Sequence, residues 1–256
     1  MKEARLEQIT SMLHQYGKVE VMNLCRIFGT TEMTIRRDLT ELVNRKIAVR
    51  THGGAMLVSG DMLSEKPKEL RAVSNIKEKE AIAKEAVSLL QDGQVVFFDS
   101  STSVLQLARL LTNEHKLLVV TDTISTALEL NSRVNIQVIC IGGELRKNTC
   151  SCHGMFAEQM LSSMHFDIAF LSVPKVSITG VLSTPNSVEV SIKKQAMQRA
   201  SKVALLVDHS KFSDPDFLEQ GHISDADVII TDSKMPAEFI ELCKKEGVAT
   251  IIADVT

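Results

Sequence analysis

The sequence predicts an α/β protein with a small, mainly helical N-terminal unit and a larger unit built on a mostly parallel sheet. The chain has 256 residues and 44% hydrophobic composition, enough for one small and one ordinary domain. Short apolar runs alternate with helical segments from Asn75 onward, which is typical of a sheet covered by helices. We expect units at residues 1–58 and 75–256, joined by a polar linker at residues 59–74.

Three short amphipathic helices are predicted in the first unit. Apolar residues recur at helical spacing from Leu6 to Leu13 and from Val21 to Phe28, and a glycine ends each repeat. A third helix begins at a threonine cap, Thr30 or Thr31. Its apolar stripe consists of Ile35, Leu39, Leu42 and Val43.

The opposite face of the third helix is rich in hydrogen-bond donors. At 100° per residue, the side chains that point away from the apolar stripe are Met33, Arg36, Arg37, Thr40 and Asn44. Arginine on such a face can reach guanine edges or phosphates, and threonine and asparagine add further donors. Thr31 and Thr34 lie at the start of the same candidate DNA-binding surface.

Residues 47–57 predict two short strands about a Gly53-Gly54 turn, with Arg50 and His52 projecting from the ribbon. Together with the helices, this ribbon predicts a winged helix-turn-helix. Residues 1–56 hold nine Lys/Arg and six Asp/Glu, a net charge of +3, although the whole chain carries -3. The basic charge therefore lies where DNA binding needs it. The alternative is a plain helical bundle whose arginines only face water.

The larger unit is predicted to contain a Rossmann-like, mostly parallel sheet. Its strand-like runs include Val95–Phe98, Leu117–Val120, Ile136–Ile141, Val203–Val207 and Val228–Ile230. Ligands bind beyond the carboxyl ends of strands in such sheets, so the residues after each run are the candidates for a ligand site.

Polar residues follow several of these runs. The stretch Asp99-Ser100-Ser101-Thr102-Ser103 opens a helix, and its hydroxyl and N–H groups can hold a phosphate. Thr121-Asp122-Thr123 and Gly142-Gly143 occupy the same place after the next two strands. Lys211, beside Asp208, can pair with a phosphate as a compact cation. The structural alternatives are helix caps, a tight turn and a surface lysine with its acidic neighbour.

The string Thr34-Ile35-Arg36-Arg37-Asp38-Leu39, followed by Leu42 and then Arg50–Ala55, resembles the signature of DeoR-type bacterial regulators. Lys46 departs from the glycine usual there. The resemblance continues through the larger unit, which in this family is similar to ribose-5-phosphate isomerase and senses phosphorylated sugars. It implies a transcriptional regulator, usually a repressor, that binds operator DNA. A homo-oligomer, a dimer or tetramer, is expected because two recognition helices must reach successive major grooves.

The same resemblance implies effector-site roles by position. These positions are Asp99–Ser103, with Ser101 in place of a glycine, then Gly142, Gly143, Arg146, Gly154, Thr184, Pro185, Glu189, Lys193 and Asp208–Phe212. Two departures stand out, because Pro174 occupies the position of an acid and Asn186 a position where aspartate is common. The lost carboxylate and the gain of Lys175 favour a more anionic ligand, or one with fewer donors, as a hypothesis.

Other classes of function fit these residues less well. An isomerase or deaminase with an appended DNA-binding module would need a general base, and Pro174 replaces the expected acid, so we expect no enzyme. Cys150-Ser151-Cys152-His153 has poor spacing for zinc, and no glycine-rich nucleotide motif occurs, so neither metal nor cofactor is expected. Five scattered cysteines predict reduced thiols. No apolar run approaches the ~18 residues of a membrane span, and no leader is evident, so we expect a cytoplasmic protein.

Overall fold

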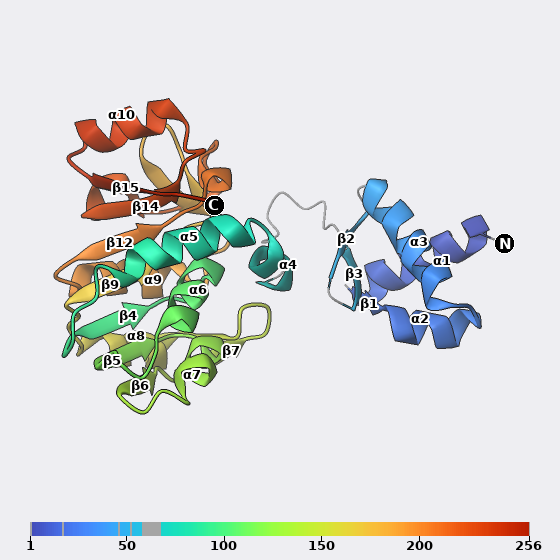
Figure 1. Cartoon of the computed structure of the whole chain (residues 1–256), viewed down its shortest axis with the longest axis horizontal. Helices are drawn as coiled ribbons and strands as arrows, with labels where there is room; N and C mark the ends of the chain where they lie inside the picture. Colours follow the sequence, from blue (N-terminus) through green and yellow to red (C-terminus); the bar gives the residue numbers. More distant parts are fainter. Residues whose placement is uncertain (1, 17, 46, 52, 58–67, 256) are drawn as a thin grey trace. The chain divides into compact units, whose positions relative to one another are not determined.

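The computed structural model describes residues 2–16, 18–45, 47–51, 53–57 and 68–255 (Figure 1). The chain divides into two compact units, Met1–Arg71 and Ala72–Thr256. Most of the segment interpreted as a linker, residues 59–74, lies outside the described ranges, and helix α4 (Lys68–Val73) occupies its end. Over the described ranges, no helix is long and apolar enough to cross a membrane.

The first unit contains the three predicted helices, α1 (Lys2–Tyr16), α2 (Val21–Phe28) and α3 (Glu32–Asn44). Gly29 ends α2 in the left-handed conformation, at φ 58°, and its N–H donates to the carbonyl of Cys25. Thr31 caps α3. The helices share one apolar core, formed chiefly by Leu6, Ile9, Leu13, Leu24, Ile35, Leu39 and Leu42.

The predicted ribbon is present as β2 (Ala48–Arg50) and β3 (Gly54–Leu57), but a third strand, β1 (Lys18–Glu20), pairs with β3. Gly54 is the first residue of β3 and not part of the turn, which corrects our placement. A Cβ at this position would lie 1.9 Å from the carbonyl oxygen of Val19. Glycine is therefore required because β1 pairs closely with the start of β3, beside the turn.

A buried ion pair joins α3 to α1. The Arg5 Nε lies 2.5 Å from Asp38 Oδ2, and the Asp38 side chain is only 2% exposed. Asp38 stands three residues after Ile35, on the inward face of α3. The pair therefore fixes the rotation of α3 about its own axis and determines which side chains face outward.

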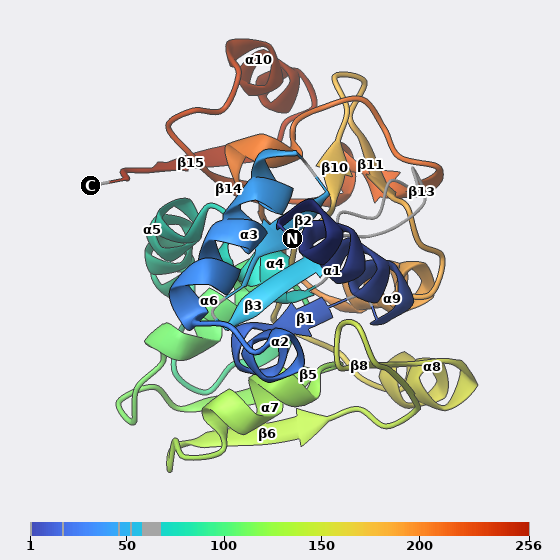
Figure 2. The ribbon, with the colours of Figure 1, turned by 90° about the vertical axis from the view of Figure 1, so that its right-hand side faces the viewer.

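The second unit is built on a seven-stranded sheet with the order β15-β14-β12-β9-β4-β5-β6, and all its pairings are parallel. The predicted α/β fold class is confirmed. The strands are β4 (Val95–Phe98), β5 (Leu117–Thr121), β6 (Ile136–Cys140), β9 (Ile168–Leu171), β12 (Val203–Leu206), β14 (Val228–Asp232) and β15 (Ala249–Ala253). In Figure 2, β6 lies at one edge of the sheet and β15 at the other.

Helices cover both faces of the sheet and give three layers. Along β4, Val96 and Phe98 contribute to one apolar core, and Phe97 contributes to the other. The first core packs against α5 (Ile76–Val87), α6 (Thr102–Leu110) and α7 (Ile124–Leu130). The second core packs against α8 (Met155–Ser162), α9 (Val190–Arg199) and α10 (Ala237–Lys245).

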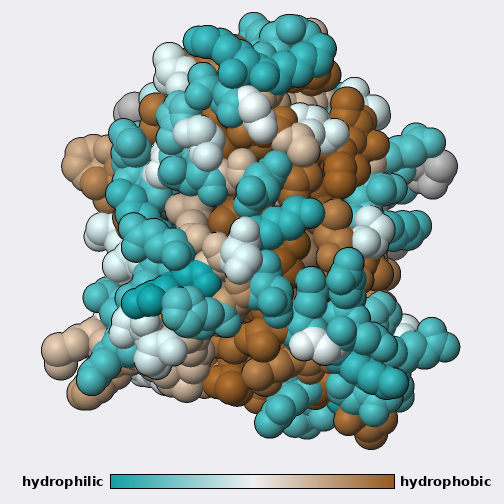
Figure 3. All heavy atoms as spheres, turned by 90° about the vertical axis from the view of Figure 1, so that its left-hand side faces the viewer, coloured by the Kyte–Doolittle hydropathy of each residue, from teal (hydrophilic) through white to brown (hydrophobic). Residues whose placement is uncertain are grey.

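Short elements absent from our prediction lie beside the main sheet. One is the antiparallel pair β7 (Glu144–Arg146) and β8 (Ser151–His153). Another is the small sheet of β10 (Lys175–Val176), β11 (Val181–Thr184) and β13 (Leu218–His222). The 3-10 turns η1 (His209–Lys211) and η2 (Ile223–Asp225) complete the unit. Figure 3 shows one face of this unit, where hydrophilic side chains surround and interrupt the apolar areas.

We predict that Asp38→Ala lowers the free energy of unfolding of the first unit by about 2 kcal/mol, because Arg5 loses its buried partner. Tyr16, the only tyrosine, lies in this unit, and its emission during urea denaturation of the full chain reports the unit's unfolding. Glu3→Ala is the matched control, since its exposed pair with Arg45 also joins α1 to the end of α3. The control should cost less than about 1 kcal/mol. Equal effects of the two substitutions would contradict the structural role of Asp38.

Candidate functional site

The outward face of α3 carries the side chains predicted for DNA binding. Thr31, Met33, Arg36, Arg37, Thr40 and Asn44 are exposed, and Thr34 is half-buried. Arg36 Nη2 lies 3.1 Å from Glu32 Oε2, and the Thr40 hydroxyl donates to the carbonyl of Arg36. Arg50 is half-buried in β2. His52 lies outside the described residues.

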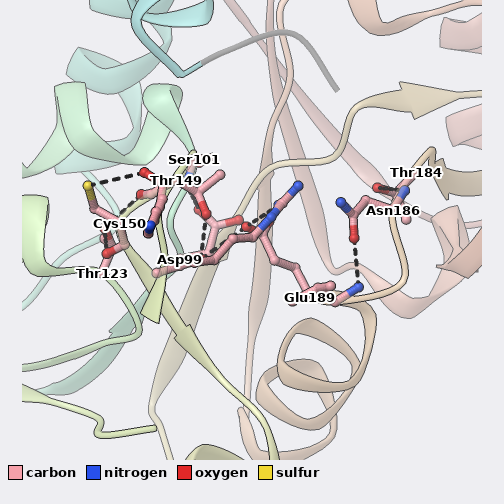
Figure 4. Close-up of polar contacts among 12 residues, drawn as sticks. Asp99, Ser101, Thr123, Thr149, Cys150, Thr184, Asn186 and Glu189 are labelled. Atoms are coloured by element: carbon pink, nitrogen blue, oxygen red, sulfur yellow. Dashed lines mark hydrogen bonds and ion pairs between the residues drawn. The ribbon is translucent and has the colours of Figure 1, made fainter. Parts of the chain in front are cut away.

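The carboxyl ends of the parallel strands meet at one edge of the sheet, where Asp99 begins the loop after β4. Asp99 is fully buried, with 0% exposure. Its Oδ1 accepts from the N–H of Ser101 (2.9 Å), and its Oδ2 accepts from the N–H of Ser172 (2.9 Å) and from Lys193 Nζ (2.8 Å) (Figure 4). Lys193 also donates to the carbonyl of Ser172 (2.5 Å). One carboxylate therefore connects β4, β9 and α9.

This ion pair lies at the point where the strand order reverses. The chain passes from β4 to β5 and β6 on one side of the sheet, and then returns to β9 on the other side of β4. Such switch points are where open α/β sheets bind ligands. Burial alone would lower the pKa of Lys193, but Asp99 and Glu189 outweigh it and the pKa is raised. The ammonium is therefore charged at neutral pH.

The polar stretch after β4 has both a capping role and a position suited to an anion. The Ser101 hydroxyl accepts from the N–H of Val104 (3.2 Å) at the start of α6, so the helix-cap alternative is realised. Ser100, Thr102 and Ser103 are buried beside it. The positive end of the α6 dipole points to this loop, which favours negative charge there.

A second cation lies in the β7–β8 pair. Arg146 Nη1 contacts Glu189 Oε1 at 2.9 Å, and the Ser151 hydroxyl donates to the same oxygen at 3.1 Å. The hydroxyls of Thr149 and Ser151 lie 2.7 Å apart. The Thr123 hydroxyl donates to the carbonyl of Cys150 (3.1 Å), which attaches the β7–β8 pair to the end of β5 (Figure 4).

The residues after β5 and β6 lie against the β7–β8 pair. Thr121 and Asp122 are fully buried, and the carbonyl of Asp122 accepts from the N–H of Cys152. Gly142 and Gly143 are exposed. A Cβ at Gly143 would lie 2.5 Å from the carbonyl oxygen of His153, so this glycine permits the close approach of β8.

Asp208 and Lys211 lie beyond β12, at the same edge of the sheet. Asp208 Oδ1 accepts from Asn75 Nδ2 (2.7 Å) and from the N–H of Ser210 (3.1 Å). Burial alone would raise the pKa of Asp208, but the charge of Lys211 and the hydrogen bonds from Ser210 and Asn75 lower it. Asp208 is therefore ionised near neutral pH.

Two predicted effector residues, Lys175 and Thr184, lie in the small sheet of β10, β11 and β13. Lys175 lies in β10, and its Nζ pairs with Asp216 Oδ1 at 3.0 Å, so its charge already has a partner. Thr184 ends β11, and its hydroxyl accepts from the N–H of Asn186 (3.3 Å). The effector roles of Lys175 and Thr184 stay predictions.

Sequence reasoning missed Asp38, Thr149, Ser151 and Asn75. The position of Asp38 on the apolar stripe of α3 was a usable signal, because only a paired acid is tolerated there. For Asn75 and Ser151 no local signal exists, since their partners are distant in sequence. In the described part of the chain, no group of three or more His, Cys, Asp and Glu side chains is placed to hold a metal ion.

Comparisons with known proteins show which family the chain matches. The model of the DeoR-like helix-turn-helix domain matches residues 5–60, and that of the DeoR C terminal sensor domain matches residues 74–233. The chain is similar to the HTH-type transcriptional regulator GlpR of Haloferax volcanii, at 34% identity over 247 residues, covering 96% of each protein. It is equally similar to the lactose phosphotransferase system repressor of Lactococcus lactis, at 34% over 242 residues and 94% of each. Among solved structures, ribose 5-phosphate isomerase A of Methanocaldococcus jannaschii aligns with a TM-score of 0.41 and 22% identity, covering 55% of this chain and 56% of that one.

A helix-turn-helix unit followed by an α/β sensor unit defines a DNA-binding transcriptional regulator that responds to a small molecule. The chain belongs to the DeoR family. The family resemblance seen in the sequence is confirmed. The expectation of a regulator and not an enzyme is confirmed by the relatives, which are named as regulators and repressors.

We predict that Lys193→Met lowers the free energy of unfolding of the sensor unit by about 3 kcal/mol, because Asp99 then stays buried without its counter-ion. Since the pKa of Lys193 is raised by folding, this contribution is present at neutral pH and is lost only above about pH 10.4, the ordinary lysine pKa. Calorimetric melting of the full chain measures it. Lys194→Met, at the exposed neighbouring position, is the control and should change stability by less than about 0.5 kcal/mol. Equal effects would show that the ion pair is not stabilising.

Proposed function

We propose that this chain represses a carbohydrate-utilisation operon in the cytoplasm by binding operator DNA, under the control of a phosphorylated sugar or a related anionic metabolite. The buried Lys193–Asp99 pair beside the start of α6 is the observation that carries the effector assignment. It places a buried ammonium beside its carboxylate partner at the switch point of the sheet.

The chemistry of this edge supports an anionic, hydroxyl-bearing ligand. Lys193 and Arg146 supply two cations, and the N-terminus of α6 adds a further positive potential. Asp99 and Glu189 supply carboxylate acceptors of the kind that bind sugar hydroxyls. A phosphate on Arg146 and sugar hydroxyls on Glu189 would replace the contact that these two side chains now make with each other.

The names of the relatives support the same assignment. The chain matches a repressor of a lactose phosphotransferase system along 94% of its length. A repressor of sugar uptake needs a signal that reports the sugar, and a phosphorylated form of it is such a signal. We propose that this chain responds to a ligand of that class.

The hydrogen bonds of Asn75 offer a route by which the effector signal could leave the site. Asn75, at the start of α5, has a left-handed backbone with φ 50°, and its side chain donates to both Asp208 Oδ1 (2.7 Å) and Ser210 Oγ (3.0 Å). Lys79, one turn later, donates to the carbonyl of Ser74 (2.7 Å). An effector that engages the Asp208–Lys211 loop would compete for the hydrogen bonds of Asn75. Binding would thereby release or tighten the first turn of α5.

A dimer or tetramer is part of the proposal. One recognition helix would read one half-site, and two helices in successive major grooves would raise the affinity and read a symmetric operator. The effector would then act by changing the spacing or orientation of the two helices.

We predict that a sugar phosphate binds the full chain more tightly than the unphosphorylated sugar or inorganic phosphate, and that it alters the gel shift of DNA from upstream of the chain's own gene. Arg146→Ala should weaken calorimetric binding of the sugar phosphate by about 10- to 100-fold, since charge-assisted hydrogen bonds contribute about 1.5–3 kcal/mol. Arg109→Ala is the control, because Arg109 pairs with Glu129 on the exposed side of α6. If all three ligands bound alike, or if Arg109→Ala matched Arg146→Ala, the effector assignment would be wrong.

We predict that Asn75→Gly leaves effector affinity within about threefold but lowers the coupling between effector and DNA by about 1 kcal/mol. Glycine keeps the left-handed backbone without strain and removes only the side-chain hydrogen bonds. The coupling is measured as the ratio of DNA affinities with and without saturating sugar phosphate. Asn131→Gly, at an exposed position after α7, is the control. An unchanged coupling in Asn75→Gly would rule out this route.

A further inference from the structure

The most exposed large apolar side chain among the described residues of the first unit is Met33, in the first turn of α3. It is 73% exposed, against 58% for Met22 and Ile27. A single exposed apolar side chain is ordinary on a protein surface. The position of Met33 is what distinguishes it, because it stands on the outward face of the helix that presents Arg36, Arg37 and Thr40.

Most polar groups on this face already have partners within the helix. Arg36 pairs with Glu32 at 3.1 Å, the Thr40 hydroxyl donates to the carbonyl of Arg36 at 2.8 Å, and the hydroxyls of Thr31 and Thr34 lie 3.1 Å apart. Arg37 differs, since none of the ion pairs between described residues includes it. Its guanidinium is therefore available to a ligand without first breaking a contact.

Met33 and Arg37 are four residues apart and share one strip of the helix surface. Side chains at this spacing have Cβ atoms about 5–6 Å apart. Base pairs in DNA are stacked about 3.4 Å apart. The two side chains can therefore reach adjacent or next-but-one base pairs at the same time.

We propose that Met33 and Arg37 together determine base specificity, with Met33 packing on the C5-methyl group of a thymine and Arg37 donating two hydrogen bonds to O6 and N7 of a neighbouring guanine. These are the base-edge groups that an apolar side chain and an arginine recognise in the major groove. Arg36, held by Glu32, then serves mainly in contacts to the phosphate backbone. The inference rests on the proposed binding of operator DNA by α3 and adds which bases it reads.

The test begins with selection of binding sites from a random duplex library by the full-length protein. Each thymine of the selected site is then replaced by deoxyuridine, which removes only the methyl group. We expect one thymine in each half-site at which uracil weakens binding about fourfold, the effect of losing one buried methyl contact. Met33→Ala should weaken binding of the thymine site by a similar factor and should no longer distinguish uracil from thymine there.

Arg37→Ala should weaken binding about 5- to 150-fold and relax selection at the guanine next to that thymine. Met22→Ala is the matched control, because Met22 is an exposed methionine of α2, and it should keep the full uracil sensitivity. If uracil at every thymine left affinity within twofold, or if Met33→Ala kept the sensitivity, the inference would be overturned while DNA binding stood. Selection of no sequence at all would overturn the proposed function and this inference with it.

Discussion

The sensor unit depends on the buried ion pair between Asp99 and Lys193. A carboxylate with 0% exposure and an ammonium with 6% exposure cost several kcal/mol each to bury, and only complete pairing offsets that cost. The partners come from three places, namely the loop after β4, the loop after β9 and helix α9. The pair therefore forms only when both halves of the sheet are assembled, and it then fixes an ammonium and its carboxylate partner where an α/β sheet binds ligands.

The DNA-binding unit also contains a buried ion pair that joins two of its elements. Asp38 lies on the inward face of α3 and pairs with Arg5 of α1, so the helix cannot rotate without leaving a buried charge unpaired. The outward face of α3 is thereby defined. In both units, an acid on an otherwise apolar surface orients the element that carries function.

Periodicity in the sequence was enough to predict the elements but not their long-range contacts. The stripe from Ile35 to Leu42 predicted α3 and its outward face, and the apolar runs predicted five of the seven strands of a mostly parallel sheet, without their order. Strand β1 was missed because three residues between two helices are too few to show a period. The contacts of Asp99 with Lys193 and of Asn75 with Asp208 join residues 94 and 133 positions apart, and no local pattern encodes them. The effector-site positions were implied by family resemblance, and the structure adds which of them touch.

The central claim is that one protein couples ligand binding at the switch point of the sheet to DNA binding by α3. Coupling is reciprocal, so a ligand that changes DNA affinity must itself bind the free and the DNA-bound protein differently. Calorimetric titration of a sugar phosphate into the full chain, alone and saturated with its selected operator duplex, measures this most directly. The account predicts dissociation constants that differ by about 5- to 150-fold. Equal constants in the two titrations would contradict it.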